Sequence, residues 1–259
     1  MMITVGLELS PADLLAGLKH RGQVVAMLVA NLLVFPALTW AAATAAGLSP
    51  GFTAGLLLCA AAPGGPTGPL FTKIGKGDLG FATASMALLG FVALVSAPVT
   101  MTLLLGASSG GSIAWPMFKT LALFQILPLV AAMGVRRLAP ALAGRVAGPA
   151  GVLANLLLMG VIVGLLYVRG ELLFATGPGV QALIIGLLMV PLAPALLAKD
   201  TGGRIRAAGL VTTVRNLTVA LLLSGRFFPD PETDVAILVC AFWMMLLPAG
   251  VAWVRGRNR

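Results

Sequence analysis

Long stretches without any aspartate, glutamate, lysine, arginine or histidine decide what this chain can fold into. They cover residues 22–72, 79–118, 146–168, 172–198 and 235–254. A bilayer core about 30 Å thick needs roughly 20 apolar residues per helix, and each stretch is long enough. The apolar residues run continuously rather than in alternation, which disfavours a β-barrel. With 59% apolar and 10% charged residues, the chain lacks the polar surface of a soluble domain. The sequence predicts an all-α polytopic membrane protein.

Clusters of glycine, proline, serine and charge divide the apolar runs into eight expected membrane spans. They are 23–46, 52–75 (interrupted), 79–105, 115–135, 148–168, 178–198, 206–226 and 235–254. The segment Met1–Leu9 resembles the tail of one further helix, and Arg136–Ala147 is expected to be a linker. We therefore expect about eight full spans and an N-terminal helix remnant.

The basic residues predict how the spans are oriented. If alternate loops are cytoplasmic, that side holds Lys19, Arg21, Lys73, Lys76, Arg136, Arg137, Arg145, Lys199, Arg204, Arg206, Arg255, Arg257 and Arg259. The other side holds only Lys119, Arg169 and Arg226. Lysine and arginine concentrate in cytoplasmic loops, so we expect a multi-pass protein of the cell (inner) membrane with a cytoplasmic C-terminus. Because orientation accounts for nearly all of the positive charge, nothing is left to indicate nucleic-acid binding.

The segment Pro63–Pro69 breaks the rules for a membrane helix. It places three prolines and three glycines within seven residues near the middle of the second span, and each internal proline costs about 3 kcal/mol in a helix. We expect two half-helices, near 52–62 and 70–76, whose ends face the gap. Unwound carbonyls suit a cation and the N-terminal end of a half-helix suits an anion. The alternative is a kink packed against neighbouring helices.

Arg215 is the second violation, since it lies about ten residues from either end of the span 206–226. An arginine at a helix centre costs about 2.5–3.5 kcal/mol on insertion scales. Asn216, Thr212, Thr213 and Thr218 add hydrogen-bonding groups beside it. The cluster is expected to face the protein interior or a cavity, where Arg215 binds an anion or gates access. The alternatives are that Arg215 snorkels or ties backbone carbonyls together.

An interrupted or polar span in each half of the chain is typical of secondary transporters built from inverted repeats. The first repeat would be residues 1–114, with the helix remnant and three spans, of which the second is broken at 63–69. The second repeat would be residues 115–259, with five spans and the Arg215–Asn216 pair in the fourth. This difference predicts a truncated or late-started version of a ten-helix protein.

Three segments resemble the bile acid:sodium symporter family in order and spacing. Val5–Asp13 resembles the end of the family's second helix, and Pro63–Gly65 followed by Lys73–Asp78 resembles its fourth-helix segment. Thr213–Leu217 resembles the ninth-helix segment of a bacterial branch that carries an Arg-Asn pair. The resemblance covers essentially the whole chain, which is N-terminally short because the first helix has no counterpart.

The resemblance implies crossed broken helices in a core domain, with a panel domain that rocks against it. It also implies an organic anion as substrate and Na⁺ as the coupling ion, with no other cofactor. Asn31 stands where the family often has a sodium-binding glutamine, and Thr67 lies by the first break. Val211 replaces a family glutamate and Arg215 a family glutamine, while Gly68-Pro69 replaces a Ser-Asn pair. These departures argue against the usual sodium sites.

The leading hypothesis is a secondary active transporter of a small organic anion, such as a carboxylate. Its predicted anion-binding residues are Arg215, Asn216, Thr212, Thr213, Thr67, Gly68 and Asn31, and the predicted ion-binding residues are Asn31, Thr67 and Val211. The spans 115–135 and 148–168 would rock to alternate access. The rival is a non-transporting or inactive truncated membrane component that needs a partner chain. An enzyme is not expected, because no nucleophile triad, metal cluster or phosphate loop is visible; the oligomeric state stays open.

Overall fold

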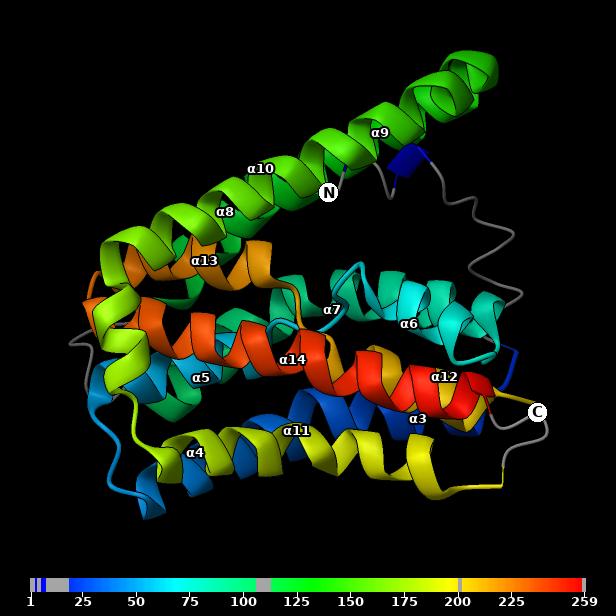
Figure 1. The fold of residues 1–259 in the computed structure, drawn as a ribbon. Coiled ribbons are helices and arrows are strands. Elements are labelled where there is room, and N and C mark those ends of the chain that lie inside the picture. The colour runs from blue at the N-terminus through cyan, green and yellow to red at the C-terminus, as the bar shows by residue number, and fades with distance from the viewer. Residues whose placement is uncertain (1–2, 4–5, 8–18, 106–112, 200–201, 258–259) are drawn as a thin grey trace.

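The structure is a computed structural model that describes residues 3, 6–7, 19–105, 113–199 and 202–257. The described helices lie in three layers (Figure 1). One outer layer holds α8, α9 and α10, the middle layer holds the broken helices, and the opposite outer layer holds α3, α4 and α11. Most of the expected helix remnant at 1–9 lies outside the described residues.

Six helical spans are long and apolar enough to cross a membrane. Two of them contain a π-helical turn: α3 (Arg21–Val29), η1 (Ala30–Val34) and α4 (Phe35–Ala45) form the first, and α8 (Ala114–Leu121), η2 (Ala122–Ile126) and α9 (Leu127–Leu138) form another. The others are α7 (Leu79–Leu105), α10 (Pro140–Ala175), α11 (Pro178–Leu197) and α14 (Pro231–Arg257). The prediction of an all-α polytopic membrane protein is confirmed.

Two pairs of short helices complete the eight expected crossings. The first pair is α5 (Pro50–Ala61) and α6 (Gly68–Ile74), and the second is α12 (Arg204–Thr213) and α13 (Leu217–Phe227). The first break lies where the prolines and glycines predict it. The residue pattern alone, which gives 206–226 without an interruption, misses the second break that the resemblance implies: the helix stops at Thr213 and resumes at Leu217.

The expected linker at 136–147 is also wrong, since most of it is helical. Helix α9 runs to Leu138, Ala139 alone separates it from α10, and α10 begins at Pro140. Ala139 leaves the helical conformation (φ −140°, ψ 68°), because the residue before a proline is disfavoured in the α region. The proline therefore makes the corner, and the neighbouring arginines do not prevent the helices from continuing.

The two breaks hydrogen-bond to each other through their backbones. The Gly65 N–H donates to the Val214 carbonyl at 3.2 Å, and the Asn216 N–H donates to the Ala62 carbonyl at 2.7 Å. Pro63 and Arg215 form an isolated antiparallel bridge between the same segments. Because no water is present in a bilayer core, unwound backbone is tolerated only where protein satisfies it. Each break thus supplies the hydrogen-bond partners that the other needs.

Two glycines make this close crossing possible. Gly64 has a φ of +84°, in the left-handed region that side chains rarely adopt. A Cβ added to Gly65 would lie 2.4 Å from the Arg215 carbonyl oxygen and 2.7 Å from Val214 Cγ1. Both neighbours belong to the other break, and one of them is backbone, so neither can move away cheaply.

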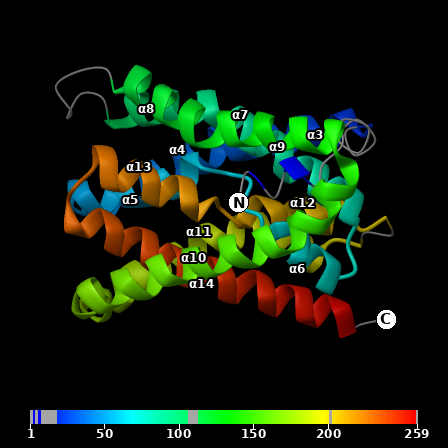
Figure 2. The ribbon, with the colours of Figure 1, turned by 90° about the horizontal axis from the view of Figure 1, so that it is seen from above.

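The outer layers pack on opposite sides of this core. Helix α8 packs against α7, and α10 packs against α9 and α14, while α11 packs against α12, α14 and α4. Seen from above, α8 and α9 run along one flank, and α10 crosses the molecule obliquely from the end of α9 toward the side of α14 (Figure 2). In the most apolar stretch of α10, within Pro140–Gly164, only 6% of the residues are buried by the described protein. The α8–α10 layer is therefore attached less tightly than the helices that form the crossing.

The basic ends of several helices gather at one end of the molecule. The start of α3, the end of α6, the start of α12 and the end of α14 lie together there (Figure 1). Arg206 Nη1 donates to the carbonyls of Gly75 and Lys76 at 2.8 and 3.0 Å, and Arg204 contacts His20. These contacts connect α12 to the end of α6 and to the segment before α3.

We expect Gly65→Ala to destabilise the protein by about 3 kcal/mol or to prevent its folding, because the added methyl overlaps the paired break. The measurement is the thermal unfolding midpoint of the detergent-purified protein. Gly186→Ala in α11 is the matched control, since a Cβ there meets nothing within 4 Å. Equal midpoints for the two variants would contradict the close crossing.

Candidate substrate site at the helix crossing

Arg215 lies within the second break, and its side chain is 1% exposed. Its Nη1 donates to Asn31 Oδ1 at 2.9 Å and approaches the Ala60 carbonyl oxygen at 3.4 Å. The guanidinium carbon lies 3.9 Å from the centre of the Phe35 ring, a cation–π geometry. The side chain therefore does not snorkel; it joins the second break to α5, η1 and α4.

The position of Arg215 also suits its charge. Ala60 lies in the last turn of α5, where unpaired carbonyls give a helix its partial negative end. Helix α12 likewise ends at the crossing, with Thr213. Two C-terminal half-helix ends thus face the break that holds the guanidinium, and their partial charges offset part of the cost of burying it.

One edge of the guanidinium has no partner within the described protein. Nε and Nη2 of Arg215 are buried and form no hydrogen bond there. A buried donor without an acceptor costs about 1–3 kcal/mol, and more when it is charged. This edge is the fork that binds a carboxylate through two parallel N–H···O bonds. The other edge, which carries Nη1, is held by Asn31 and Ala60.

Asn31 fixes the orientation of the held edge. It is fully buried in the π-helical turn η1, and its Nδ2 donates to the Met27 carbonyl at 2.8 Å and to Thr212 Oγ1 at 3.0 Å. Both amide protons are used, so the carbonyl oxygen faces Arg215. π-Helical turns occur often at functional sites, because the extra residue redirects a side chain. Asn31, Thr212 and Arg215 thus form one connected polar cluster.

The other predicted anion-binding residues lie near the crossing but have other contacts. Asn216 caps α13, its Oδ1 accepting from the Val219 N–H at 3.3 Å. Thr213 donates back to the Gly209 carbonyl of its own helix, and Thr67 Oγ1 lies 3.9 Å from the sulfur of Met245. Gly68 begins α6 and packs against Val211.

The residues at the crossing do not fit a sodium ion. Val211 is fully buried and apolar, and its Cγ2 lies 3.3 Å from where a Cβ on Gly68 would be. Among the described residues no aspartate or glutamate is buried, and no cluster of metal-ligating side chains occurs. A sodium ion about 4 Å from the guanidinium would meet a repulsion of roughly 4 kcal/mol at an effective dielectric constant near 20. Nothing charged in the described core would offset it.

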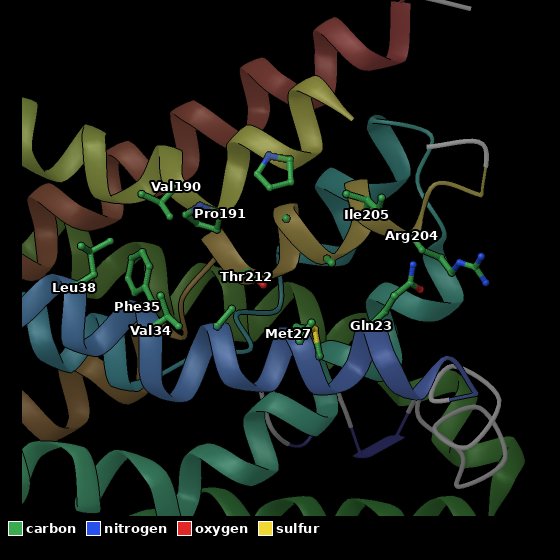
Figure 3. Close-up of a pocket in the computed structure, with 15 residues that line it drawn as sticks. Gln23, Met27, Val34, Phe35, Leu38, Val190, Pro191, Arg204, Ile205 and Thr212 are labelled. Carbon is green, nitrogen blue, oxygen red and sulfur yellow. The ribbon is translucent and has the colours of Figure 1, made fainter. Parts of the chain in front are cut away.

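Two pockets lie against the core helices. One, of about 320 Å³, lies between α3–α4, α11 and α12. Phe35 and Thr212, which contact the Arg215–Asn31 pair, form part of its wall, and Gln23 and Arg204 lie at one end (Figure 3). The other, of about 530 Å³, lies between α10 and α13 and includes Thr218 near the start of α13. This second pocket lies where the α8–α10 layer meets the core.

Sequence reasoning did not find Phe35 or the Ala60 carbonyl. Phe35 stands in an apolar run that reads as ordinary core, and a backbone carbonyl carries no residue-specific signal. Met244 was missed as well, although its sulfur lies 3.4 Å from the Arg215 backbone nitrogen. These partners become visible only once the two breaks are placed together.

Two helices broken at mid-length and crossed at their breaks are the architecture of secondary transporters. Comparison with known protein families also indicates a transporter. The model of the sodium bile acid symporter family matches residues 1–176, about two thirds of the chain. The chain belongs to this family of membrane transporters. No individual curated protein matches it.

Replacing Asn31 with leucine is expected to destabilise the protein by about 2–3 kcal/mol, because Arg215 Nη1 would lose its best acceptor while buried. Thermal or denaturant unfolding in detergent measures the change. Thr213→Val is the control: its hydroxyl is equally buried but bonds only within its own helix, so we expect a loss below about 1 kcal/mol. A larger loss for the control than for Asn31→Leu would refute the central role of the Arg215–Asn31 bond.

Proposed function

We propose that this protein carries a small organic anion, such as a carboxylate, across the cytoplasmic membrane by alternating access, and that Arg215 binds the anion. The observation that carries the proposal is the unpartnered Nε–Nη2 edge of a fully buried arginine at the helix crossing. Membership of a symporter family supports transport in general. The chemistry of this edge narrows the substrate to an anion.

A carboxylate matches the free edge in both charge and shape. Its two oxygens can accept one hydrogen bond each from Nε and Nη2, an arrangement that makes arginine the preferred carboxylate ligand. Binding there would satisfy both orphan donors and neutralise the buried charge. Because the guanidinium is enclosed by α5, η1 and the second break, the bound group must be small.

The half-helix N-termini add to the preference for an anion. Helices α6 and α13 both begin at the crossing, at Gly68 and Leu217, and the N-terminal end of a helix carries partial positive charge. Thr212, whose hydroxyl accepts from Asn31 Nδ2, lies close to the crossing and lines the pocket between α3–α4, α11 and α12. The partial positive charge of these two helix ends adds to the charge of Arg215 in favouring an anion, and it opposes the partial negative charge at the C-terminal ends of α5 and α12.

Alternating access requires that one part of the protein move against another. We assign the moving interface to the contact of the α8–α10 layer with the core. This layer contacts the core mainly through α7 and α14, and α10 is little buried. The pocket between α10 and α13 would open or close as the layer rocks. The paired breaks, whose backbone groups bond to each other, would move as one body.

Mutation of Arg215 tests the anion-binding role. In proteoliposomes, uptake of labelled pyruvate or benzoate by Arg215→Gln should fall about a hundredfold, since a charged pair of hydrogen bonds to the substrate is lost. Arg226→Gln is the matched control, because Arg226 is exposed in the last turn of α13. If Arg215→Gln takes up the anion as fast as the wild-type protein does, Arg215 is not the anion-binding residue.

We further propose that the end of the molecule that carries the basic helix ends faces the cytoplasm. The start of α3 and the ends of α6 and α14 bear Arg21, Lys73 and Arg255, and lysine and arginine accumulate on that side. The opposite end carries Glu232 and Asp234 in the first turn of α14. The C-terminus would then be cytoplasmic.

Fusions at the C-terminus check this orientation. Green fluorescent protein attached after Arg259 should fluoresce, and alkaline phosphatase attached there should be inactive, because each reporter folds on only one side of the membrane. The opposite pair of results would invert the topology. Western blotting of both fusions controls for expression.

A further inference from the structure

The held edge of Arg215 contacts two oxygens of the protein, Asn31 Oδ1 and the Ala60 carbonyl. We propose that the guanidinium is a permanent substitute for the coupling cation, so that this protein moves its anion without sodium. The inference rests on the proposed function only where it speaks of transport. The claim that the crossing does not bind sodium stands on the contacts of the described residues alone.

The two oxygens on the held edge are of the kind that cations use in broken-helix transporters. One is the amide oxygen of Asn31, at 2.9 Å from Nη1, and the other is the Ala60 carbonyl in the last turn of α5, at 3.4 Å. Carbonyls at half-helix C-terminal ends and in unwound segments coordinate Na⁺ in such proteins. Here both oxygens face a covalently attached positive charge.

Among the described residues, no buried carboxylate is present to bind a second cation at the crossing. The described carboxylates are Asp78, Glu171, Asp230, Glu232 and Asp234, and none of them is buried. Asp78 caps α7 by accepting from the Phe81 N–H, and Asp234 accepts from Ser224. An ion entering beside Arg215 would therefore find its charge repelled and two candidate ligands already occupied.

A tethered cation also changes what drives transport. A sodium ion can leave on the far side of the membrane and so bring its gradient to bear on the substrate, but Arg215 cannot leave. The anion would then move down its own electrochemical gradient or in exchange for another anion. When the carboxylate binds, the crossing becomes neutral; when it leaves, the buried charge is uncompensated. This favours exchange over return of the empty carrier.

Sodium binding is tested directly on the purified wild-type protein by thermal unfolding in NaCl and in KCl at equal ionic strength, with no anion substrate added. We expect the two midpoints to agree within about 1 °C. If the protein had a sodium site and the sodium concentration were well above its dissociation constant, the midpoint in NaCl would be about 5 °C higher than in KCl. A sodium-specific rise in wild type overturns the proposal, whether or not the protein transports anything.

A double variant tests whether the guanidinium is what keeps sodium out. Val211→Glu/Arg215→Gln replaces the cation by an amide and adds a carboxylate in the last turn of α12, four positions before residue 215, so its midpoint should rise in NaCl relative to KCl. Arg215→Gln alone is the control for loss of the positive charge. If the double variant folds and still does not respond to sodium, the crossing is no cation site and the proposal falls; if it does not fold, the wild-type series still decides.

Uptake separates this inference from the proposed function. Proteoliposomes preloaded with unlabelled benzoate are diluted into labelled benzoate, in sodium-free potassium buffer and in sodium buffer. Equal exchange in both buffers supports the tethered cation. Exchange that requires sodium, by about tenfold or more, contradicts it while leaving anion transport intact. Absence of exchange in both buffers would count against the proposed function, and the sodium-binding result would remain decisive here.

Discussion

The backbone N–H and C=O groups of the two breaks must find hydrogen-bond partners inside the membrane. The rest of the crossing depends on how these groups are paired. The breaks meet as an antiparallel bridge, in which Gly65 donates to Val214 and Asn216 donates to Ala62. Only a glycine at position 65 allows this approach. The bridge fixes the position of Arg215, whose side chain then reaches the end of α5 and the π-helical turn that holds Asn31.

This arrangement gives the two edges of one guanidinium different surroundings. The edge with Nη1 meets oxygens of the protein, and the edge with Nε and Nη2 meets none among the described residues. Unsatisfied buried donors cost free energy, and Arg215 has two of them on one buried guanidinium. We therefore propose that the Nη1 edge takes the place of a bound cation and that the Nε–Nη2 edge binds the anion. It also explains why a symporter family can contain a chain whose crossing does not suit sodium.

Sequence could predict the spans and the first break, because apolar length, proline and glycine act locally. The second break has no such signal: Val214, Arg215 and Asn216 are all compatible with a helix, and the chain unwinds there because Ala62 and Gly65 offer better-placed partners. The resemblance to a family, rather than any residue pattern, implied it. Arg215 was found as a charged residue in an apolar run, and Asn31 was found through the resemblance. The contact between them, the contact with Phe35 and the capping role of Asn216 depend on tertiary packing. Pro140 ended a helix where the charges around it predicted a linker.

The most direct test of the account is to locate a bound anion. A structure of the protein with 4-bromobenzoate would show the bromine by its anomalous signal and the carboxylate by its density. We predict the carboxylate on the Nε–Nη2 edge of Arg215, with Asn31 and the Ala60 carbonyl still on Nη1. A carboxylate bound elsewhere, with that edge of the guanidinium paired to the protein itself, would contradict the account.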